Sequence, residues 1–152
     1  MQELKFKSNS PFSNYYPCKV YFDGVMFLSS EAAYQSHKTD KEHIWKFFSS
    51  LSPDDSKALG RALTIRKDWE EIKYKLMYNV VSCKFIQNPE LLQLLLKTNG
   101  SYLVEDTTGW HDNIWGNCDC PVCKNIKGQN LLGKALTEFR EDYLRGAYNG
   151  RK

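Results

Sequence analysis

The spacing of apolar residues separates a short β region at the N-terminus from a longer helical region. The apolar runs KVYF at 19–22 and VMFL at 25–28 flank Asp23-Gly24. This arrangement predicts a β-hairpin, because a type I′ turn needs positive φ at both central residues and Asp-Gly tolerates it. We therefore expect β structure within about the first 30 residues.

Helical spacing dominates the remainder of the chain. The longest predicted helix runs from Lys67 to about Gln87. Its apolar residues recur at i, i+3, i+7, i+11 and i+14, a spacing that places them on one stripe facing the core. The residues of this stripe are Trp69, Ile72, Leu76, Val80 and Cys83.

Start and stop signals mark the other elements. Ser52-Pro53-Asp54-Asp55 gives the clearest set, since it supplies an N-cap, an N1 proline and first-turn acids. A short strand is expected from Tyr102 to Glu105. The further predicted helices run from Glu31 to Lys38 with Ser30 as N-cap, around Ile44 to Ser50, from Ser52 to Leu63, from Pro89 to near Asn99-Gly100, and from Asn130 to Leu144 with Gly146 as its stop.

These elements predict an α+β fold, a mainly helical single domain over residues 1–152 with a small N-terminal β-hairpin or sheet. That length suffices to bury a sizeable core, and a hydrophobic fraction of 41% argues against disorder. The net charge is +3, with acids and bases interspersed, which favours neither a DNA-coating protein nor a membrane-surface protein. The sequence indicates no particular oligomeric state.

The cellular setting is predicted from the N-terminus, the hydropathy and the cysteines. The first residues, MQELKFKSNS, are charged and lack the apolar centre of a signal peptide. No apolar run approaches the roughly 18 residues of a membrane span. Five cysteines without a signal peptide indicate free or metal-bound thiols in a reducing compartment. We expect a cytoplasmic protein with no membrane partner.

The segment from Glu105 to Gly133 is the most unusual part of the sequence, since it has neither helical nor strand periodicity. Loops longer than about a dozen residues are uncommon in compact domains and are often functional. This one carries Trp110 and Trp115, whose ring planes can stack on bases and sugars, and the acids Glu105 and Asp112. Paired acids are the usual means of glycoside hydrolysis. The alternative is that both acids only cap turns or pair with Arg or Lys.

Three cysteines of the same segment form a C-x-C-x-x-C pattern whose spacing can clasp a structural Zn²⁺. Three ligands do not complete the tetrahedron of such a site, so a fourth must come from elsewhere. The alternative is a set of reduced thiols that stiffens the loop. We expect no other cofactor to be required. The cysteines are Cys118, Cys120 and Cys123, and the candidates for the fourth ligand are His111, Cys18 and Cys83.

The predicted helix SEAAYQSHK offers a second candidate surface. Glu31, Tyr34, Gln35 and Lys38 lie at i, i+3, i+4 and i+7 and share one face, which can form a polar wall around a ligand. The alternative is a solvated face on which the helix dipole favours the glutamate. Asn14 lies in a turn-like stretch, where its side chain can equally close a local turn.

Taken together, these pieces resemble the NADAR family, the YbiA-like domain named for its association with NAD and ADP-ribose. The matching motifs occur in the family's order over roughly residues 10–145, which makes the set far more specific than any one motif. They are FSN at 12–14, SSEAAYQSHK at 29–38, LGR at 59–61, KFIQNP at 84–89, LVE at 103–105, DNIWG at 112–116, and GQNLLGKAL at 128–136 followed by Arg140.

The resemblance implies a compact, mainly helical fold and an N-glycosidase, which cleaves the bond between a ribose anomeric carbon and a base nitrogen. Two substrate classes come with it. One is the phosphorylated ribosylaminouracil intermediates of riboflavin synthesis, which are small-molecule N-ribosides. The other is ADP-ribose attached to a nucleobase of DNA or RNA, notably guanine. The resemblance also favours a functional role for the polar helix face over a solvated one.

Carried over by position, the resemblance makes Glu31, Glu105 and Asp112 the pocket acids. Lys38 is a candidate nucleophile, since a desolvated lysine can attack the anomeric carbon and form a Schiff base with the opened sugar. The expected substrate-binding residues are Trp115, which would stack on the ligand, Asn14, Arg61 and Asn130, which would hold ribose or phosphate, and Tyr34.

The chain departs from plainer members of the family in two inserts. TTGWH lengthens the path from Glu105 to Asp112, and CDCPVCKN fills the gap between WG and GQN. A longer loop at the edge of the active site can alter substrate choice or add a metal-binding site. Two rival functions stay open: a non-catalytic reader of ADP-ribose or NAD, and a zinc-stabilised nucleic-acid adaptor, which the near-neutral charge disfavours.

Overall fold

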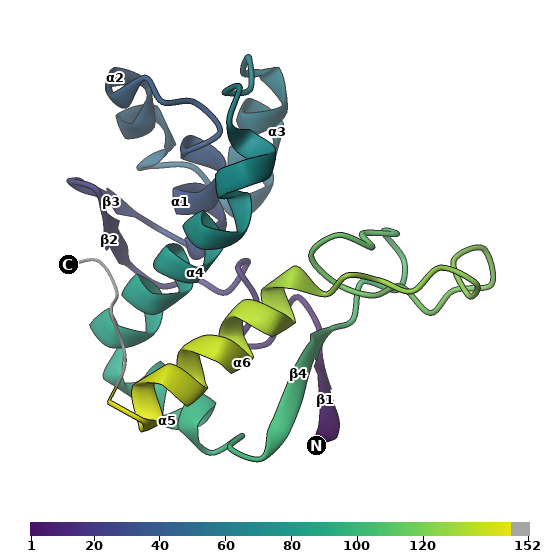
Figure 1. The fold of residues 1–152 in the computed structure, drawn as a ribbon. Coiled ribbons are helices and arrows are strands. Elements are labelled where there is room, and N and C mark those ends of the chain that lie inside the picture. Colours follow the sequence, from purple (N-terminus) through teal and green to yellow (C-terminus); the bar gives the residue numbers. More distant parts are fainter. Residues whose placement is uncertain (147–152) are drawn as a thin grey trace.

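The computed structural model of the chain describes residues 1–146 and confirms the predicted α+β class (Figure 1). Residues 147–152 of the predicted domain lie outside the described residues. In chain order the elements are β1 (Gln2–Phe6), β2 (Val20–Phe22), β3 (Val25–Phe27), α1 (Ser30–Ser36), α2 (Glu42–Trp45), the 3₁₀ turn η1 (Lys46–Phe48), α3 (Pro53–Ala62), α4 (Trp69–Gln87), α5 (Pro89–Leu96), β4 (Ser101–Glu105) and α6 (Leu131–Leu144).

The predicted hairpin is confirmed. Strands β2 and β3 pair antiparallel, with Val20 opposite Phe27. At the turn, Asp23 has φ of 49° and Gly24 has φ of 86°, so both central residues take the positive φ that the turn needs. Buried side chains on the inner face of this hairpin pack against α4.

The second sheet was not predicted. Strand β1 pairs in parallel with β4, in a register that runs from Gln2 opposite Ser101 to Phe6 opposite Glu105. The two strands belong to opposite ends of the chain, and local spacing carries no signal for such a pairing. Because both strands run in the same direction, Glu105 arrives at the carboxyl end of the sheet, where the long loop begins.

Helix α4 lies at the centre of the core. Trp69, Leu76, Val80 and Cys83 of its predicted stripe are buried and Ile72 is partly buried, so the stripe is confirmed. Its second half is buried on further sides as well, because α6 crosses it and the hairpin packs on it (Figure 1). The buried residues that α6 contributes to this core are Leu132, Ala135, Leu136 and Phe139.

Several helix starts differ from the predictions. The N-cap of α1 is Ser29, whose hydroxyl accepts from the Ala32 amide at 3.1 Å, whereas Ser30 is the first helical residue and donates to Asn14. Helix α4 starts at Trp69 rather than at position 67. The predicted N-cap of α3 is confirmed, since Ser52 accepts from the Asp55 amide.

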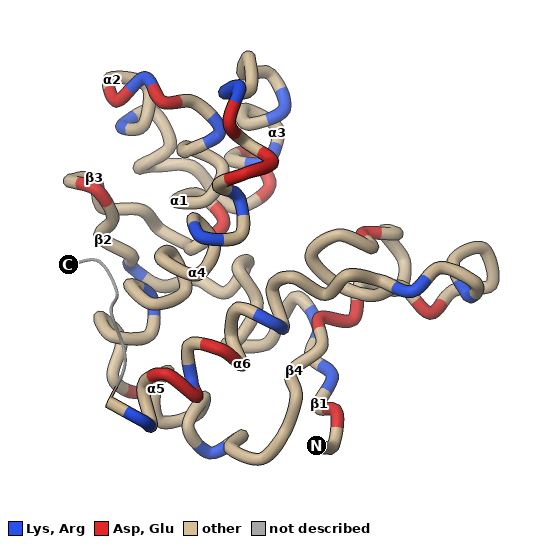
Figure 2. Tube along the Cα trace, in the orientation of Figure 1, with Lys and Arg blue, Asp and Glu red and all other residues tan. Residues whose placement is uncertain are grey.

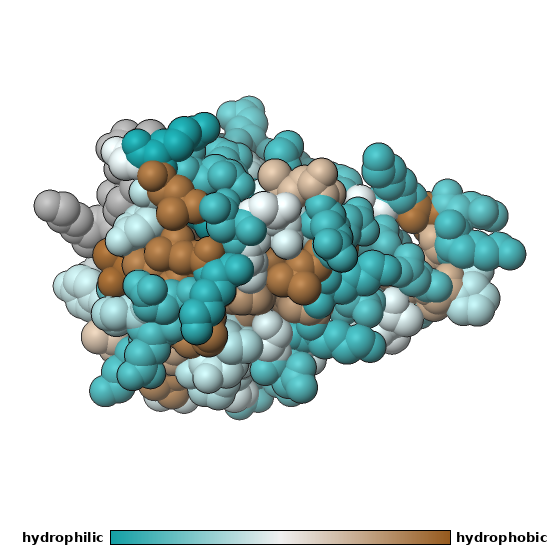
Figure 3. Space-filling view, turned by 90° about the horizontal axis from the view of Figure 1, so that it is seen from below, coloured by the Kyte–Doolittle hydropathy of each residue, from teal (hydrophilic) through white to brown (hydrophobic). Residues whose placement is uncertain are grey.

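Charges of both signs are interspersed over the fold, as Figure 2 shows. In residues 1–146 no helix combines the length and apolarity needed to cross a membrane. The face in Figure 3 carries its brown, hydrophobic residues mainly on the body, while the loop projecting to the right is mostly hydrophilic.

Candidate active site

A cavity of about 510 Å³ lies between two walls built from distant parts of the chain. We call the first the helical wall: Glu31, Tyr34, Gln35 and Lys38 in and just after α1, with Asp54, Lys57 and Arg61 of α3. The second is the lip, the long loop of residues 106–130, which joins the cavity together with Glu105 at the end of β4. The lip contributes Trp110, Asp112, Ile114 and Trp115 to the lining. The remaining lining residues, outside both walls, are Ser8, Ser13, Asn14, Tyr15 and Met77.

The polar face of α1 lines this cavity, so the alternative of a solvated face is wrong. Glu31, Tyr34 and Gln35 are buried and Lys38 is partly buried. Helix α3 packs closely against α1 because Gly60 has no side chain, and a Cβ there would meet the Gln35 side chain. The glycine of the LGR motif thus brings α3 against the polar face of α1.

Glu31 is a buried carboxyl with one close partner. The Gln35 amide Nε2 donates to its Oε2 at 2.6 Å. Burial raises the pKa of Glu31 above its ordinary value, and Gln35, Lys57 and Lys38 oppose that rise. The carboxyl can therefore hold a proton at a higher pH than a surface glutamate does.

Lys38 has the opposite shift. Burial lowers its pKa, while the neighbouring Glu31 opposes the change. Its Nζ lies 5.7 Å from the centre of the Tyr34 ring and 6.0 Å from that of Trp69. A lowered pKa leaves more of the unprotonated amine, which is the form that a lysine nucleophile needs.

Glu105 faces the cavity from the end of β4. Burial raises its pKa to about 8, and the nearby Asp112 and Glu31 charges act in the same direction. A carboxyl that keeps its proton at neutral pH can serve as a general acid. Of the acids predicted from sequence, Glu105 has the properties best suited to proton donation.

Asn130, which was expected to hold ribose or phosphate, does not line the cavity. Its Oδ1 accepts from the Glu105 amide at 2.9 Å, and its Nδ2 donates to the Leu103 carbonyl at 2.9 Å. Asn130 itself has φ of 52° just before α6. The side chain therefore ties β4 to the start of α6 and positions Glu105.

Asp112 does both things that the sequence left open. Its Oδ1 caps a turn, accepting from the amides of Ile114 and Trp115 at 2.9 Å each. The residue also lines the cavity, and its charge contributes to the raised pKa of Glu105. The turn thus holds an acid on the cavity wall.

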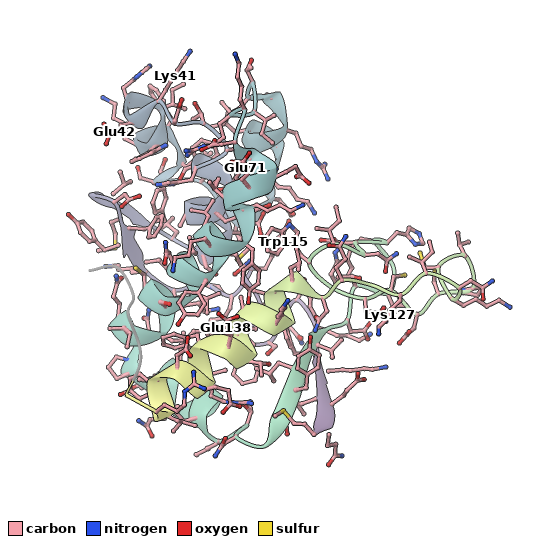
Figure 4. The ribbon with its side chains drawn as sticks, viewed as in Figure 1. Lys41, Glu42, Glu71, Trp115, Lys127 and Glu138 are labelled. Atoms are coloured by element: carbon pink, nitrogen blue, oxygen red, sulfur yellow. The ribbon has the colours of Figure 1, made fainter. Side chains whose placement is uncertain are left out.

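Trp115 and Asn14 both line the cavity. The Trp115 ring meets Tyr34 edge to face, with ring centres 5.2 Å apart. In Figure 4 it lies beside the core helices, whereas Lys127 lies out on the projecting loop. Asn14 is buried, accepts from the Ser30 hydroxyl at 2.8 Å and donates to the Met77 sulfur at 3.4 Å.

Sequence reasoning missed the lining residue Lys57 and named another, Trp110, only as an aromatic residue of the long loop. Lys57 lies one helical turn before Arg61 on α3, and together they give the cavity a cationic side. The signal for Lys57 was its i, i+4 spacing from the LGR motif. Trp110 belongs to the TTGWH insert, and only the fold of the lip brings it to the cavity.

The cysteine cluster gains its fourth donor from His111. One donor atom each from His111, Cys118, Cys120 and Cys123 lies within 4.8 Å of the others. The other candidate ligands lie elsewhere, since Cys83 is buried in α4 and Cys18 packs against the core. None of the five cysteines, which all lie within residues 1–146, forms a disulfide.

Comparison with known proteins gives the family. The NADAR domain model matches residues 2–144, and the chain belongs to this family. It is 35% identical over 133 residues to the N-glycosidase YbiA of Shigella boydii, covering 86% of this chain and 79% of that one. It is 32% identical over 137 residues to an N-glycosidase of Nostoc punctiforme, covering 86% of this chain and 83% of the relative.

Two further similarities extend this result. The riboflavin biosynthesis protein PYRR of Arabidopsis thaliana is 34% identical over 107 residues, which are 66% of this chain but only 17% of that protein. The NMR structure of the E. coli protein YbiA matches with a TM-score of 0.81 at 30% identity, covering 99% of this chain and 90% of that one. The predicted YbiA-like fold is confirmed.

Proposed function

We propose that this chain is an N-glycosidase that hydrolyses the N-ribosyl bond of a phosphorylated riboside. The observation that carries the proposal is one cavity that is lined both by the acids Glu31, Glu105 and Asp112 and by the cations Lys57 and Arg61 of α3. Acids stabilise or protonate the groups at a breaking glycosidic bond, and cations bind phosphate. The names of the relatives that match over most of their length support an activity on N-glycosyl bonds.

The cavity suggests how such a substrate would lie. Lys57 and Arg61 would hold the phosphate, the acids would surround the ribose, and Trp115 would stack on the base. Asn14 and Tyr34 would contact the sugar from the α1 side. A volume of about 510 Å³ falls in the range of small-molecule sites. The two substrate classes are a phosphorylated ribosylaminouracil and ADP-ribose on guanine.

Cleavage needs a proton on the leaving base and relief of positive charge on the sugar. Protonated Glu105 donates its proton to the base nitrogen as the carbon–nitrogen bond breaks and its electron pair goes to the base. The Asp112 carboxylate stabilises the oxocarbenium ion that forms at the ribose. Water then adds to the anomeric carbon while Glu31 on the opposite wall accepts its hydrogen bond and orients it as a positioned base, and the proton that water releases returns to Glu105.

Lys38 offers a second route to the same products. Its unprotonated amine would attack the anomeric carbon, the base would leave with the Glu105 proton, and the opened sugar would remain as an imine until water released it. Borohydride reduction during turnover distinguishes the routes. A sugar adduct on wild-type protein that is missing from Lys38→Arg supports the imine, and no adduct supports direct attack by water.

The first experiment is a mass-spectrometric base-release assay on two substrates, an ADP-ribosylated guanine oligonucleotide and the phosphoribosylaminouracil of the riboflavin pathway. We expect release from one of them and its loss in Glu105→Gln. Asp112→Asn keeps an oxygen that can cap the turn and removes the charge, whereas Asp112→Ala removes both, so the pair separates chemistry from folding. Full kcat in Glu105→Gln would contradict the acid assignment.

The same assay tests the reader alternative. A reader of ADP-ribose or NAD binds its ligand stoichiometrically and releases no base from either substrate. We also propose a cytoplasmic location, because none of the five cysteines, all within residues 1–146, forms a disulfide and a reducing compartment keeps cysteines in that state.

A further inference from the structure

The lip is folded with little apolar burial. No helix or named strand falls within residues 106–130. Its apolar tip residues are exposed, Val122 at 82% and Ile126 at 52%, and the projecting part is mainly hydrophilic in Figure 3. Ordering a backbone costs roughly 1–2 kcal/mol per residue, so other interactions must hold the loop. Among the few side chains buried there are Cys118 and Cys123.

One imidazole nitrogen lies against three sulfur atoms. His111 Nδ1 is 3.6 Å from Cys118 Sγ, 3.3 Å from Cys120 Sγ and 3.4 Å from Cys123 Sγ. Because Nδ1 has a single hydrogen or a single lone pair, hydrogen bonding accounts for one of these contacts and not for three. The arrangement therefore needs another explanation.

Zinc geometry supplies that explanation. Zinc binds sulfur at about 2.3 Å and imidazole nitrogen at about 2.0–2.1 Å, so at the tetrahedral angle the two donors stand about 3.6 Å apart. The three distances from His111 Nδ1 come within a few tenths of an ångström of that value. We propose that His111, Cys118, Cys120 and Cys123 bind one Zn²⁺ as a Cys₃His site.

The backbone around the cluster is shaped for this purpose. The chain turns tightly between two of the cysteines, since the Cys123 amide donates to the Cys120 carbonyl at 3.0 Å. The Cys118 amide is fixed by Asn113 Oδ1 at 3.0 Å. His111 has φ of 58°, an uncommon backbone for a residue other than glycine, and this conformation accompanies the turn of its ring toward the sulfurs.

Four protein ligands leave no open position, so the site is structural. Its effect reaches the cavity because His111 stands between Trp110 and Asp112, which both line it. Zinc binding therefore holds the insert's tryptophan and the turn of Asp112 on the cavity wall. This link to catalysis rests on the proposed function, whereas metal binding itself does not.

Metal content tests the site directly. Whole protein purified under reducing conditions is analysed by mass spectrometry of its metals, and we expect one zinc per chain. Cys118→Ser and Cys123→Ser should lose most of it, while Cys18→Ser, a matched control outside the lip, should keep it. Cobalt substitution should give the thiolate charge-transfer and tetrahedral d–d bands. Folding of each variant is checked by circular dichroism.

Two results would overturn the site. The first is wild-type protein that holds only a small fraction of one zinc per chain and takes up none after reduction and incubation with Zn²⁺. The second is equal zinc content in wild type, Cys118→Ser and Cys123→Ser. Detection of a disulfide between cysteines of the lip, in protein kept under reducing conditions, would count as the first result. Cysteines in a disulfide lack the thiolate that binds zinc.

Turnover tests the link to the cavity. Trp110→Ala should keep its zinc and raise KM about tenfold, because it removes an aromatic ring on which the base can stack. Cys120→Ser should raise KM as well, with a smaller change in kcat, because it loosens the wall that carries Trp110. Unchanged KM in both variants would refute the link. Absence of base release from wild type would refute the proposed function and leave the zinc measurement to stand alone.

Discussion

The two walls of the cavity are held in place by different forces. The helical wall rests on apolar packing, since Ala32 and Ala33 of α1 are completely buried and Gly60 lets α3 approach closely. The lip is held by hydrogen bonds, such as that from the buried Thr107 hydroxyl to the Asp112 carbonyl at 2.7 Å, and by the proposed metal. A tightly packed wall tolerates few substitutions. A loop held by a metal can accept substitutions at the positions between its metal-binding residues.

The walls also differ in charge. The lysine and arginine residues of the cavity lining, Lys38, Lys57 and Arg61, all belong to the helical wall. The lip supplies Asp112, Trp110 and Trp115 instead. This division suits a substrate with a phosphate at one end and a base at the other, and it makes the lip the part that would select the base.

Replacing Glu31 of the helical wall should have the largest effect on turnover. We expect Glu31→Gln to lower kcat by about 10²–10⁴-fold, the range of one positioned acid or base. The fold should survive, because an amide replaces a carboxyl of the same size. Steady-state kinetics and thermal unfolding check both points, with Glu90→Gln on the surface of α5 as control. A loss below about threefold would remove Glu31 from the chemistry.

The pH dependence of stability should report the burial of Glu105. Its pKa rises from an ordinary 4.5 to about 8 in the folded protein. Between these values the folded chain keeps a proton that the unfolded chain releases, so the free energy of unfolding falls as pH rises through this window. Glu105→Gln lacks this loss and should gain stability relative to wild type from pH 5 to pH 9, in thermal unfolding. A difference independent of pH would contradict the raised pKa.

The same group predicts the rate profile. As a general acid, Glu105 works only while protonated, so kcat/KM, which reports the pKa values of the free enzyme, should decline as pH rises through about 8. Base release measured across this range checks the decline. A rate that rises through the same range would instead assign Glu105 the role of a base.

Close packing of the helical wall can be tested at Gly60. Gly60→Leu would push against the Gln35 side chain and should lower the free energy of unfolding by about 1–3 kcal/mol. Ala58→Leu, on the exposed side of the same helix, is the matched control. Chemical denaturation of both variants gives the comparison. Equal stability of the two would show that α1 and α3 can separate without cost.

The smallest expected effect comes from the cap of α1. Ser29→Ala removes the acceptor for the Ala32 amide and should cost about 0.5–2 kcal/mol of stability with little change in KM. Ser30→Ala removes the donor to Asn14 and should raise KM as well, because Asn14 lines the cavity. Denaturation and kinetics separate the two serines. Identical kinetics would argue against a role for Asn14 in binding.

Local spacing placed four residues of one wall on a common helix face, and the family resemblance then favoured a functional role for that face. The shared face of Glu31, Tyr34, Gln35 and Lys38 follows from the helical repeat, and the structure places all four on the cavity. The hairpin at Asp23-Gly24 follows equally from the φ angles that its turn requires. The ordered family motifs predicted the family and its fold, and both are confirmed.

The lip was recognised as unusual, but its partners were not. Three candidates stood open for the fourth ligand of the cysteine cluster, and the fold brings His111 to it. Asn130 was expected at the substrate, and its side chain instead binds the backbone of β4. Both outcomes depend on how a loop without periodicity closes on itself.

The sequence by itself determined the helices, the hairpin, the polar face of α1 and the family, because these depend on residue spacing within a few turns or on ordered motifs. Only the tertiary structure decided the parallel pairing of β1 with β4, the arrival of Lys57 and Trp110 at the cavity, and the approach of Glu31 to Glu105. The physical reason is that such contacts join residues far apart in the chain, and chain spacing places no constraint on which distant groups meet until the core has packed.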